Sequence, residues 1–147
     1  MRIGGTLRRG RRWAEQLMTD RCVVRRPTGK YVTDPVTLKD VPELEVVYHP
    51  DAEPHKGRMK VQAYEAFEQE RESAGLTQII NRVRVDFPVG SAHFMPNDIV
   101  TMLESDDPLL VGRHLRLTVE APYKTHATAY RVFAEVNVGM EVPAWQG

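Results

Sequence analysis

Short stretches in which apolar and polar residues alternate, separated by turn residues, dominate this sequence. In residues 79–87, the apolar Val83, Val85 and Phe87 are separated by charged side chains. Successive side chains of a β-strand point to opposite faces, so this spacing predicts a strand with one buried and one solvated face. The same spacing, or a short apolar run, predicts further strands at 21–26, 44–49, 58–62, 99–103, 114–119 and 129–138.

Six or seven such strands, with turns between them, are typical of an antiparallel barrel or sandwich. A Rossmann-type sheet needs strands that alternate with helices, and the sequence lacks that rhythm. The 147 residues favour one domain, and a hydrophobic fraction of 41% is enough for a modest core. We therefore expect a mainly β protein: a small antiparallel β-barrel of six to seven strands, with a basic N-terminal helix and long loops.

Changes of composition divide the chain into an arm, a barrel and a tail. We expect the arm at residues 1–20, the barrel domain at 21–139 and the tail at 140–147. Three prolines and a glycine predict a long loop at 27–43. A second, acidic loop is expected as an insertion at 63–78, where helix-forming residues interrupt the alternation; a helical turn is the alternative there.

The arm is strongly basic, although the whole chain has a formal net charge of zero. Residues 1–30 contain nine Lys and Arg residues and two acidic residues, a charge of +7, so residues 31–147 carry −7. Residues 7–18 predict a short helix in which Trp13 lies four residues before Leu17. Its apolar face is too small to make it stable alone, so we expect it to dock on a partner. The candidate docking residues are Arg8, Arg9, Arg11, Arg12, Trp13 and Leu17.

Three interpretations of the arginine cluster remain open. Docking on an acidic surface, of another protein or of a second copy of this chain, is favoured. Contact with DNA phosphates would be independent of base sequence and sensitive to salt. A solvated helix face without a partner is the third interpretation.

The sequence contains no constellation of residues that supports catalysis or a metal site. His49 and His55 flank two acidic residues, but their spacing and the intervening prolines favour an exposed polar turn over a zinc site. Cys22 lies in a short apolar run, which favours a buried thiol over a reactive one. We therefore expect no enzymatic activity and no cofactor.

The order of several local phrases resembles a known family. A basic N-terminal helix is followed by MTDRCVVRRPTG at 18–29, VYHPDAEPHKGRMKVQ at 47–62, RVRVDFPV at 82–89, MPNDIVTM at 95–102, DPLLVGRHLRLTVE at 107–120 and THATAYRVFAEV at 125–136. This layout is similar to the head-to-tail connector proteins of tailed bacteriophages. It is most similar to the head-closure or stopper type found in phages of actinobacteria, over residues 7–138.

The resemblance implies a virion structural protein that acts in the host cytoplasm only during assembly. It implies a homo-oligomeric ring of about 6 or 12 copies, with portal and adaptor proteins above and a tail terminator or tail tube below. Packaged double-stranded DNA would pass through its channel, and no membrane is involved. By position alone, the family's channel loop matches Tyr64, Glu65, Phe67, Glu68, Glu70 and Glu72.

Two alternatives stay open. Another connector ring, an adaptor or a tail terminator, would differ in position and partner. A DNA-binding module with an OB-like barrel would need aromatic side chains on a basic barrel face. The barrel strands offer Arg82, Arg84, Arg116 and Arg131, but Phe87 and Tyr130 alternate onto the opposite faces, which disfavours that module.

Overall fold

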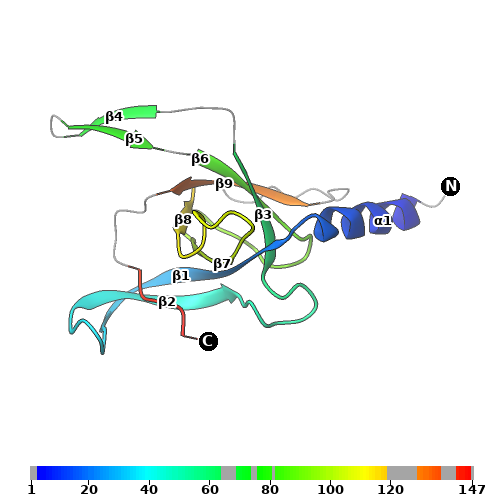
Figure 1. Cartoon of the computed structure of the whole chain (residues 1–147). Helices are drawn as coiled ribbons and strands as arrows, with labels where there is room; N and C mark the ends of the chain where they lie inside the picture. Colours follow the sequence, from blue (N-terminus) through cyan, green and yellow to red (C-terminus); the bar gives the residue numbers. More distant parts are fainter. Residues whose placement is uncertain are drawn as a thin grey trace.

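The computed structural model describes residues 3–63, 69–73, 76–80, 82–118, 129–136 and 142–146. In this part of the chain, helix α1 comes first and nine strands follow (Figure 1). The bounds are α1 Ile3–Gln16, β1 Asp20–Thr33, β2 Asp40–Tyr48, β3 Arg58–Ala63, β4 Gln69–Ser73, β5 Leu76–Ile80, β6 Arg82–Phe87, β7 Ile99–Glu104, β8 His114–Leu117 and β9 Tyr130–Val136.

Six strands form a closed antiparallel barrel in the order β1-β3-β6-β9-β8-β7, and β7 pairs back with β1. β2 is a further strand of the same sheet and pairs with β1. The prediction of a small antiparallel barrel of six to seven strands with an N-terminal helix is therefore confirmed. The single strand expected at 79–87 is divided between the end of β5 and β6.

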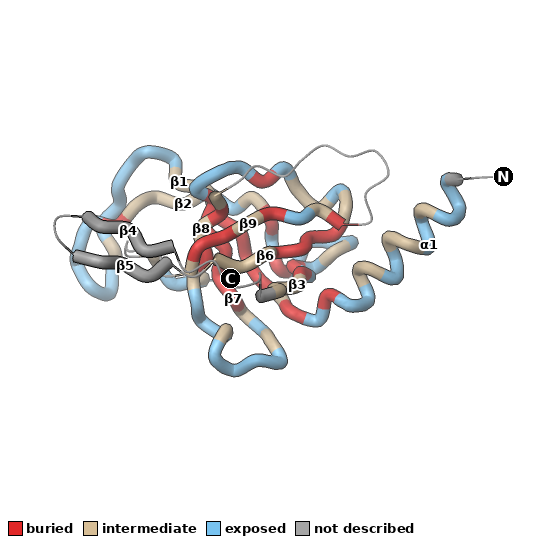
Figure 2. The backbone as a smooth tube through the Cα atoms, turned by 90° about the horizontal axis from the view of Figure 1, so that it is seen from above, coloured by how far each residue is buried: buried red, intermediate tan, exposed pale blue. Residues whose placement is uncertain are grey.

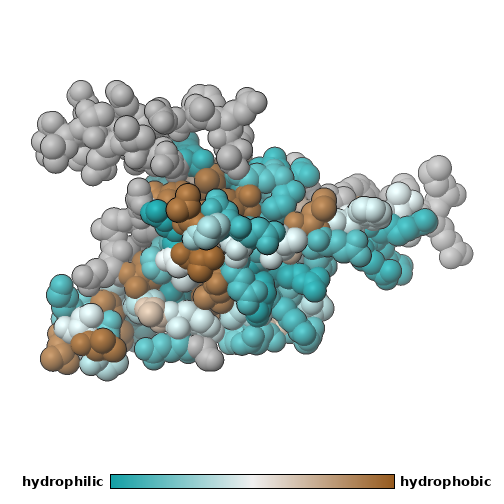
Figure 3. All heavy atoms as spheres, viewed as in Figure 1, coloured by the Kyte–Doolittle hydropathy of each residue, from teal (hydrophilic) through white to brown (hydrophobic). Residues whose placement is uncertain are grey.

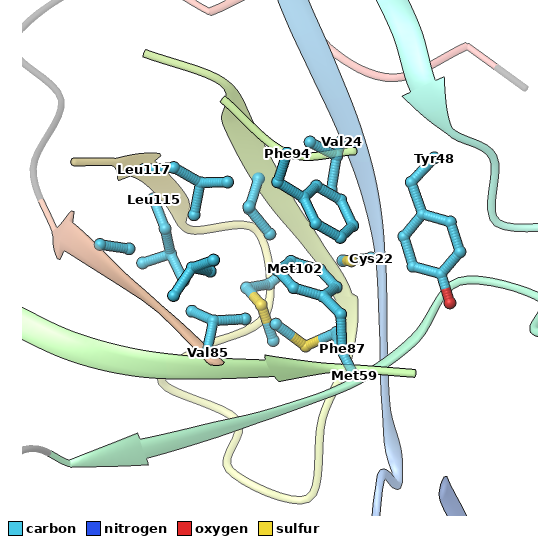
Figure 4. Packing of buried hydrophobic residues seen from close by; sticks show 13 residues of the cluster. Cys22, Val24, Tyr48, Met59, Val85, Phe87, Phe94, Met102, Leu115 and Leu117 are labelled. Atoms are coloured by element: carbon cyan, nitrogen blue, oxygen red, sulfur yellow. The ribbon is translucent and has the colours of Figure 1, made fainter. Parts of the chain in front are cut away.

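The core fills the barrel with the inward side chains of the alternating strands (Figure 4). Val85 and Phe87 of β6 are fully buried there. The Phe87 ring stacks on Phe94 with centroids 3.9 Å apart, and Tyr48 meets both rings edge-on. Burying each such side chain stabilises the fold by about 1.5–3 kcal/mol. The barrel is therefore the stable part of the molecule from which the other segments extend.

The prediction of a long loop at 27–43 is wrong, because β1 and β2 continue through this segment as a two-stranded ribbon. The register shifts between Pro27 and Tyr31, where Gly29 adopts a φ of +87°. Pro42 lies in β2, which is an edge strand. On the outer side of an edge strand, a missing N–H costs no hydrogen bond to another strand. A bulge and a sheet edge thus accommodate the residues that predict a loop. The connection itself spans only residues 34–39.

The insertion expected as an acidic loop at 63–78 contains a hairpin instead: β4 and β5 pair antiparallel, with Glu72 opposite Thr77. Helix propensity is a property of a single segment and does not include pairing with a second strand. The β-branched residues of β5 favour a strand, and β5 pairs with β4. Glu70 and Glu72 of the channel-loop candidates lie in β4. Tyr64, Glu65, Phe67 and Glu68 lie outside the described residues.

The predicted arm and tail flank the barrel. α1 covers Ile3–Gln16, and β1 begins at Asp20. Residues 142–146 of the tail have no regular secondary structure. The ring of Trp145 packs edge-on against His49, with centroids 5.3 Å apart.

Candidate docking surfaces

Helix α1 extends away from the barrel, and its C-terminal end contacts the barrel (Figures 1 and 2). Glu15 Oε1 lies 3.1 Å from His55 Nδ1, in the loop between β2 and β3, and 4.0 Å from Arg58 Nη1. Met18, two residues beyond the helix, is buried. These contacts fix the last turn of α1, and most residues of the preceding turns are exposed.

The end of α1, with Leu17 directly after it, exposes an apolar pair, and the preceding turns present a basic surface. Trp13 and Leu17 expose 69% and 58% of their surface, and the Leu17 N–H donates to the Trp13 carbonyl, so the two side chains are helical neighbours. α1 has no acidic residue in its first turn. Of the predicted docking residues, Arg8, Arg9 and Arg12 are exposed and Arg11 is half-buried. The predicted docking residues therefore lie on one projecting helical segment.

A pocket of about 240 Å³ lies at the base of this helix, and we call it the α1 notch. One wall is apolar, and the floor is the outer face of β3, β6 and β9. The lining residues are Ala14, Leu17, Met18, Lys60, Gln62, Arg84, Asp86, Ala129 and Arg131.

The α1 notch has a surplus of positive charge, because three basic residues line it with one acidic residue. Arg84 Nε lies 3.1 Å from Asp86 Oδ1, and Arg84 also donates to Gln62. Lys60 and Arg131 are the cross-strand neighbours of Asp86 and make no ion pair among the described residues. The notch therefore suits a group that is apolar on one side and anionic on the other.

The second projection is the β1–β2 ribbon, residues 26–48, which leaves the barrel opposite α1 (Figure 1). Its tip, residues 31–38, gathers hydrophobic side chains at the lower left of Figure 3. Tyr31, Val36 and Leu38 expose 71%, 80% and 78% of their surface. Leu38 also has a φ of +59°, a left-handed conformation that costs a bulky residue about 1–2 kcal/mol. Because most of the Leu38 side chain is in water, it gains little from burial in the single subunit to offset this backbone strain.

The root of the ribbon is fixed to the barrel. Arg26 donates to both carboxylate oxygens of the fully buried Asp98, at 2.8 and 3.0 Å. Asp98 Oδ2 also accepts from the Met95 N–H at 2.9 Å. A bidentate pair of this kind sets a direction as well as a position. The Arg26–Asp98 pair therefore fixes the direction in which the ribbon leaves the barrel.

A third cluster lies on the outer face of β1, β7 and β8. Arg25 is buried and donates to Thr101 Oγ1 at 2.9 Å, and the same oxygen lies 2.9 Å from His114 Nδ1. Burial, and then the Arg25 charge, lower the pKa of His114. Burial also lowers the pKa of Arg25. The cluster is a structural network with a pH-sensitive member.

The remaining chemical candidates do not converge. Cys22 is fully buried, and burial raises the pKa of its thiol, which contradicts the reactive alternative. His55 binds Glu15, whereas the His49 Nδ1 accepts from the Asp51 N–H at 3.0 Å. Within the described ranges, no group of three or more His, Cys, Asp and Glu side chains is placed to hold a metal ion.

The α1 notch and the ribbon tip were missed by reasoning from sequence. Alternation places Lys60 and Arg131 on outer faces, but only the docked helix turns that face into a pocket. The signal for the tip was the set of large apolar residues, Tyr31, Val36 and Leu38, inside a segment expected to be a polar loop.

A family model matches residues 10–135 of the chain, from the middle of α1 to the end of β9. The chain belongs to the family of unknown function DUF6093. Searches of the curated proteins and of the solved structures found no match. Among the helices of the described residues, none is long and apolar enough to cross a membrane.

Proposed function

We propose that this protein is a subunit of a ring at the head-to-tail interface of a tailed phage, where it closes the DNA-filled head and joins it to the tail. One observation carries the proposal. Six of the ten large apolar side chains that the described residues expose lie on two projections, the end of α1 and the ribbon tip, at opposite ends of a closed barrel. A ring subunit needs two such contact regions, because it touches a neighbour on each side.

The α1 arm supports protein docking better than DNA binding. Phosphate contact needs only positive charge, whereas Trp13 and Leu17 add a paired apolar surface of the kind that anchors a protein interface. On the barrel, Phe87 lies in the core and Tyr130 packs against it. Neither ring is available as a stacking platform for bases, which an OB-like module would require, so base stacking on this face would have to use the half-buried Phe133, the register partner of Arg84.

The insertion between β3 and β6 is the proposed channel element. The sequence of β4 includes Glu70 and Glu72, and negative charge in a channel lets DNA slide without adhering. Because β3 and β6 pair directly with each other, the insertion is an appendage of the barrel wall rather than part of it. An appendage of this kind can reach the lumen while the barrel remains closed.

The experiment is complementation of a phage that lacks this gene. Deleting residues 1–12 removes the arginine cluster but retains Glu15 and Met18, which hold the end of α1. We expect this variant to fold, by circular dichroism and urea unfolding, and to yield heads without tails in electron micrographs. Leu109→Ser, at an exposed residue of the loop between β7 and β8, which belongs to neither projection, is the control and should complement. Complete virions from the shortened protein would contradict the role of the arm.

A further inference from the structure

We propose that the ribbon tip of one copy docks on α1 and the α1 notch of the next copy. The inference rests on the proposed ring and names the partner of the arm: a second copy of this chain. The contact joins two different surfaces, so it is heterologous. Repetition of a heterologous contact builds a ring when the rotation between copies closes.

The positions of the two surfaces support this contact. In Figure 1 the ribbon tip and α1 lie at opposite ends of the molecule, and Figure 2 shows the same arrangement from above. The two cannot meet within one copy. Both are also exposed over most of their length, whereas most residues of the barrel strands between them are buried or half-buried (Figure 2).

The two surfaces match in shape and polarity. Leu38 and Val36 project from a narrow two-stranded tip. The α1 notch offers a concave site of about 240 Å³ with an apolar wall, and Trp13 is the helical neighbour of Leu17 in that wall. Inserting the tip would cover the most exposed apolar side chains of both projections at once. It would also give the strained Leu38 a packing partner that the single subunit lacks.

The two surfaces also match in charge. Beyond Arg26, which is bound to Asp98, the ribbon carries Lys30 and Lys39 and four acidic residues, a charge of −2. The acidic residues are Asp34, Asp40, Glu43 and Glu45. The arm and notch are positive through Arg8, Arg9, Arg12, Lys60 and Arg131. Opposite charges steer the two surfaces together and make their association sensitive to salt.

Insertion of the tip is favoured over edge-to-edge pairing of the ribbon. An exposed strand edge is a template for another strand, but Pro27 and Pro42 remove backbone donors from the two ribbon strands. Both strands are also interrupted by register shifts. The ribbon therefore presents its tip and side chains to a neighbour rather than its backbone.

Disulfide capture between copies tests the contact directly. Chains carrying Leu17→Cys are mixed with tagged chains carrying Leu38→Cys under mild oxidation, and the mixed dimer is followed on non-reducing gels. The native Cys22 does not compete, because it is fully buried. The matched control pairs Leu17→Cys with Leu109→Cys, since Leu109 is as exposed as Leu38 but lies in another loop.

We expect the 17–38 dimer to form about tenfold faster than the 17–109 dimer, because docking raises the effective thiol concentration. The difference should shrink as salt is raised. Equal rates for the two pairs at low salt would overturn the proposed contact. Trapped 17–38 dimers from a protein that fails to bind a portal would leave the contact standing and remove the connector function. Portal binding without preferential formation of the 17–38 dimer would leave the connector function standing and overturn the proposed contact.

Leu38→Asn separates docking from folding. Asparagine adopts left-handed backbone more easily than leucine, so the free energy of unfolding should be unchanged or slightly higher. The variant should nevertheless lose ring formation, because its apolar contact is gone. If Leu38→Asn subunits form rings as readily as the native protein, the tip does not mediate the contact.

Discussion

Replacing Gly57 by alanine tests how the loop between β2 and β3 is held against β1. Gly57 has a φ of +71°, and its carbonyl accepts from the Cys22 N–H at 2.9 Å. A Cβ at this position would lie 2.6 Å from the Cys22 carbonyl oxygen and 2.8 Å from Pro50 Cα. The same loop carries His55, which contacts the Glu15 carboxylate at the end of α1. The substitution therefore perturbs the support of the docking helix.

The matched control is Gly90→Ala. Gly90 has a φ of +82°, and nothing lies within 4 Å of an added Cβ. For both substitutions, left-handed backbone costs alanine about 1–2 kcal/mol, and the stiffer unfolded chain returns about 0.4–1 kcal/mol. Gly57→Ala alone must also move two backbone segments, which adds about 1–3 kcal/mol. The free energy of unfolding should fall by about 3 kcal/mol for Gly57→Ala and by about 1 kcal/mol for Gly90→Ala.

Urea unfolding followed by circular dichroism measures both values. The midpoint should fall further for Gly57→Ala, with the slope m unchanged in each variant. A difference between the two variants of less than about 0.5 kcal/mol would refute the close approach of the loop to β1. It would also remove the argument that this loop supports the end of α1.

Three further predictions concern the channel element, the root of the ribbon and the outer cluster. Replacing residues 65–80 by a short turn should leave the barrel folded, since Ala63 and Val83 are register partners, but filled heads should lose their DNA; heads that stay sealed would place the plug elsewhere. Asp98→Ala should lower the free energy of unfolding by about 2–4 kcal/mol in urea, because it strands a bound guanidinium. The pKa of His114 is lowered in the folded protein, so the unfolded chain binds the proton more readily and stability should fall as the pH drops below about 6.5. His114→Gln should flatten that dependence in urea midpoints measured between pH 7 and about 5, and an unchanged slope would exclude His114 as its source.

The barrel was predictable because its strands carry their own pattern. In β6, the spacing of Val83, Val85 and Phe87 identifies the buried face without knowledge of any neighbour. The β1–β2 ribbon was not predictable in this way. Pro27 and Pro42 normally end strands, and only the bulge and the sheet edge that tolerate them reveal a ribbon.

The candidate site was predictable only in part. The composition of residues 8–17 identified the basic and apolar helix, because its arginines and Trp13 are unusual on their own. The α1 notch depends on where the helix meets β3, β6 and β9, and that meeting rests on long-range contacts such as Glu15 with His55. The exposure of Leu38 likewise follows from a turn geometry that residue types do not reveal.

The most direct test of the proposed connector function is the mass and shape of the purified protein, alone and mixed with the portal complex encoded by the same genome. Light scattering gives the mass, and negative-stain electron microscopy gives the shape. We expect a ring of this protein seated on the portal in the mixture, and a species of smaller mass than the ring when the protein is alone. A protein that ignores the portal but shifts DNA in a salt-dependent way would contradict it and favour a DNA-binding module.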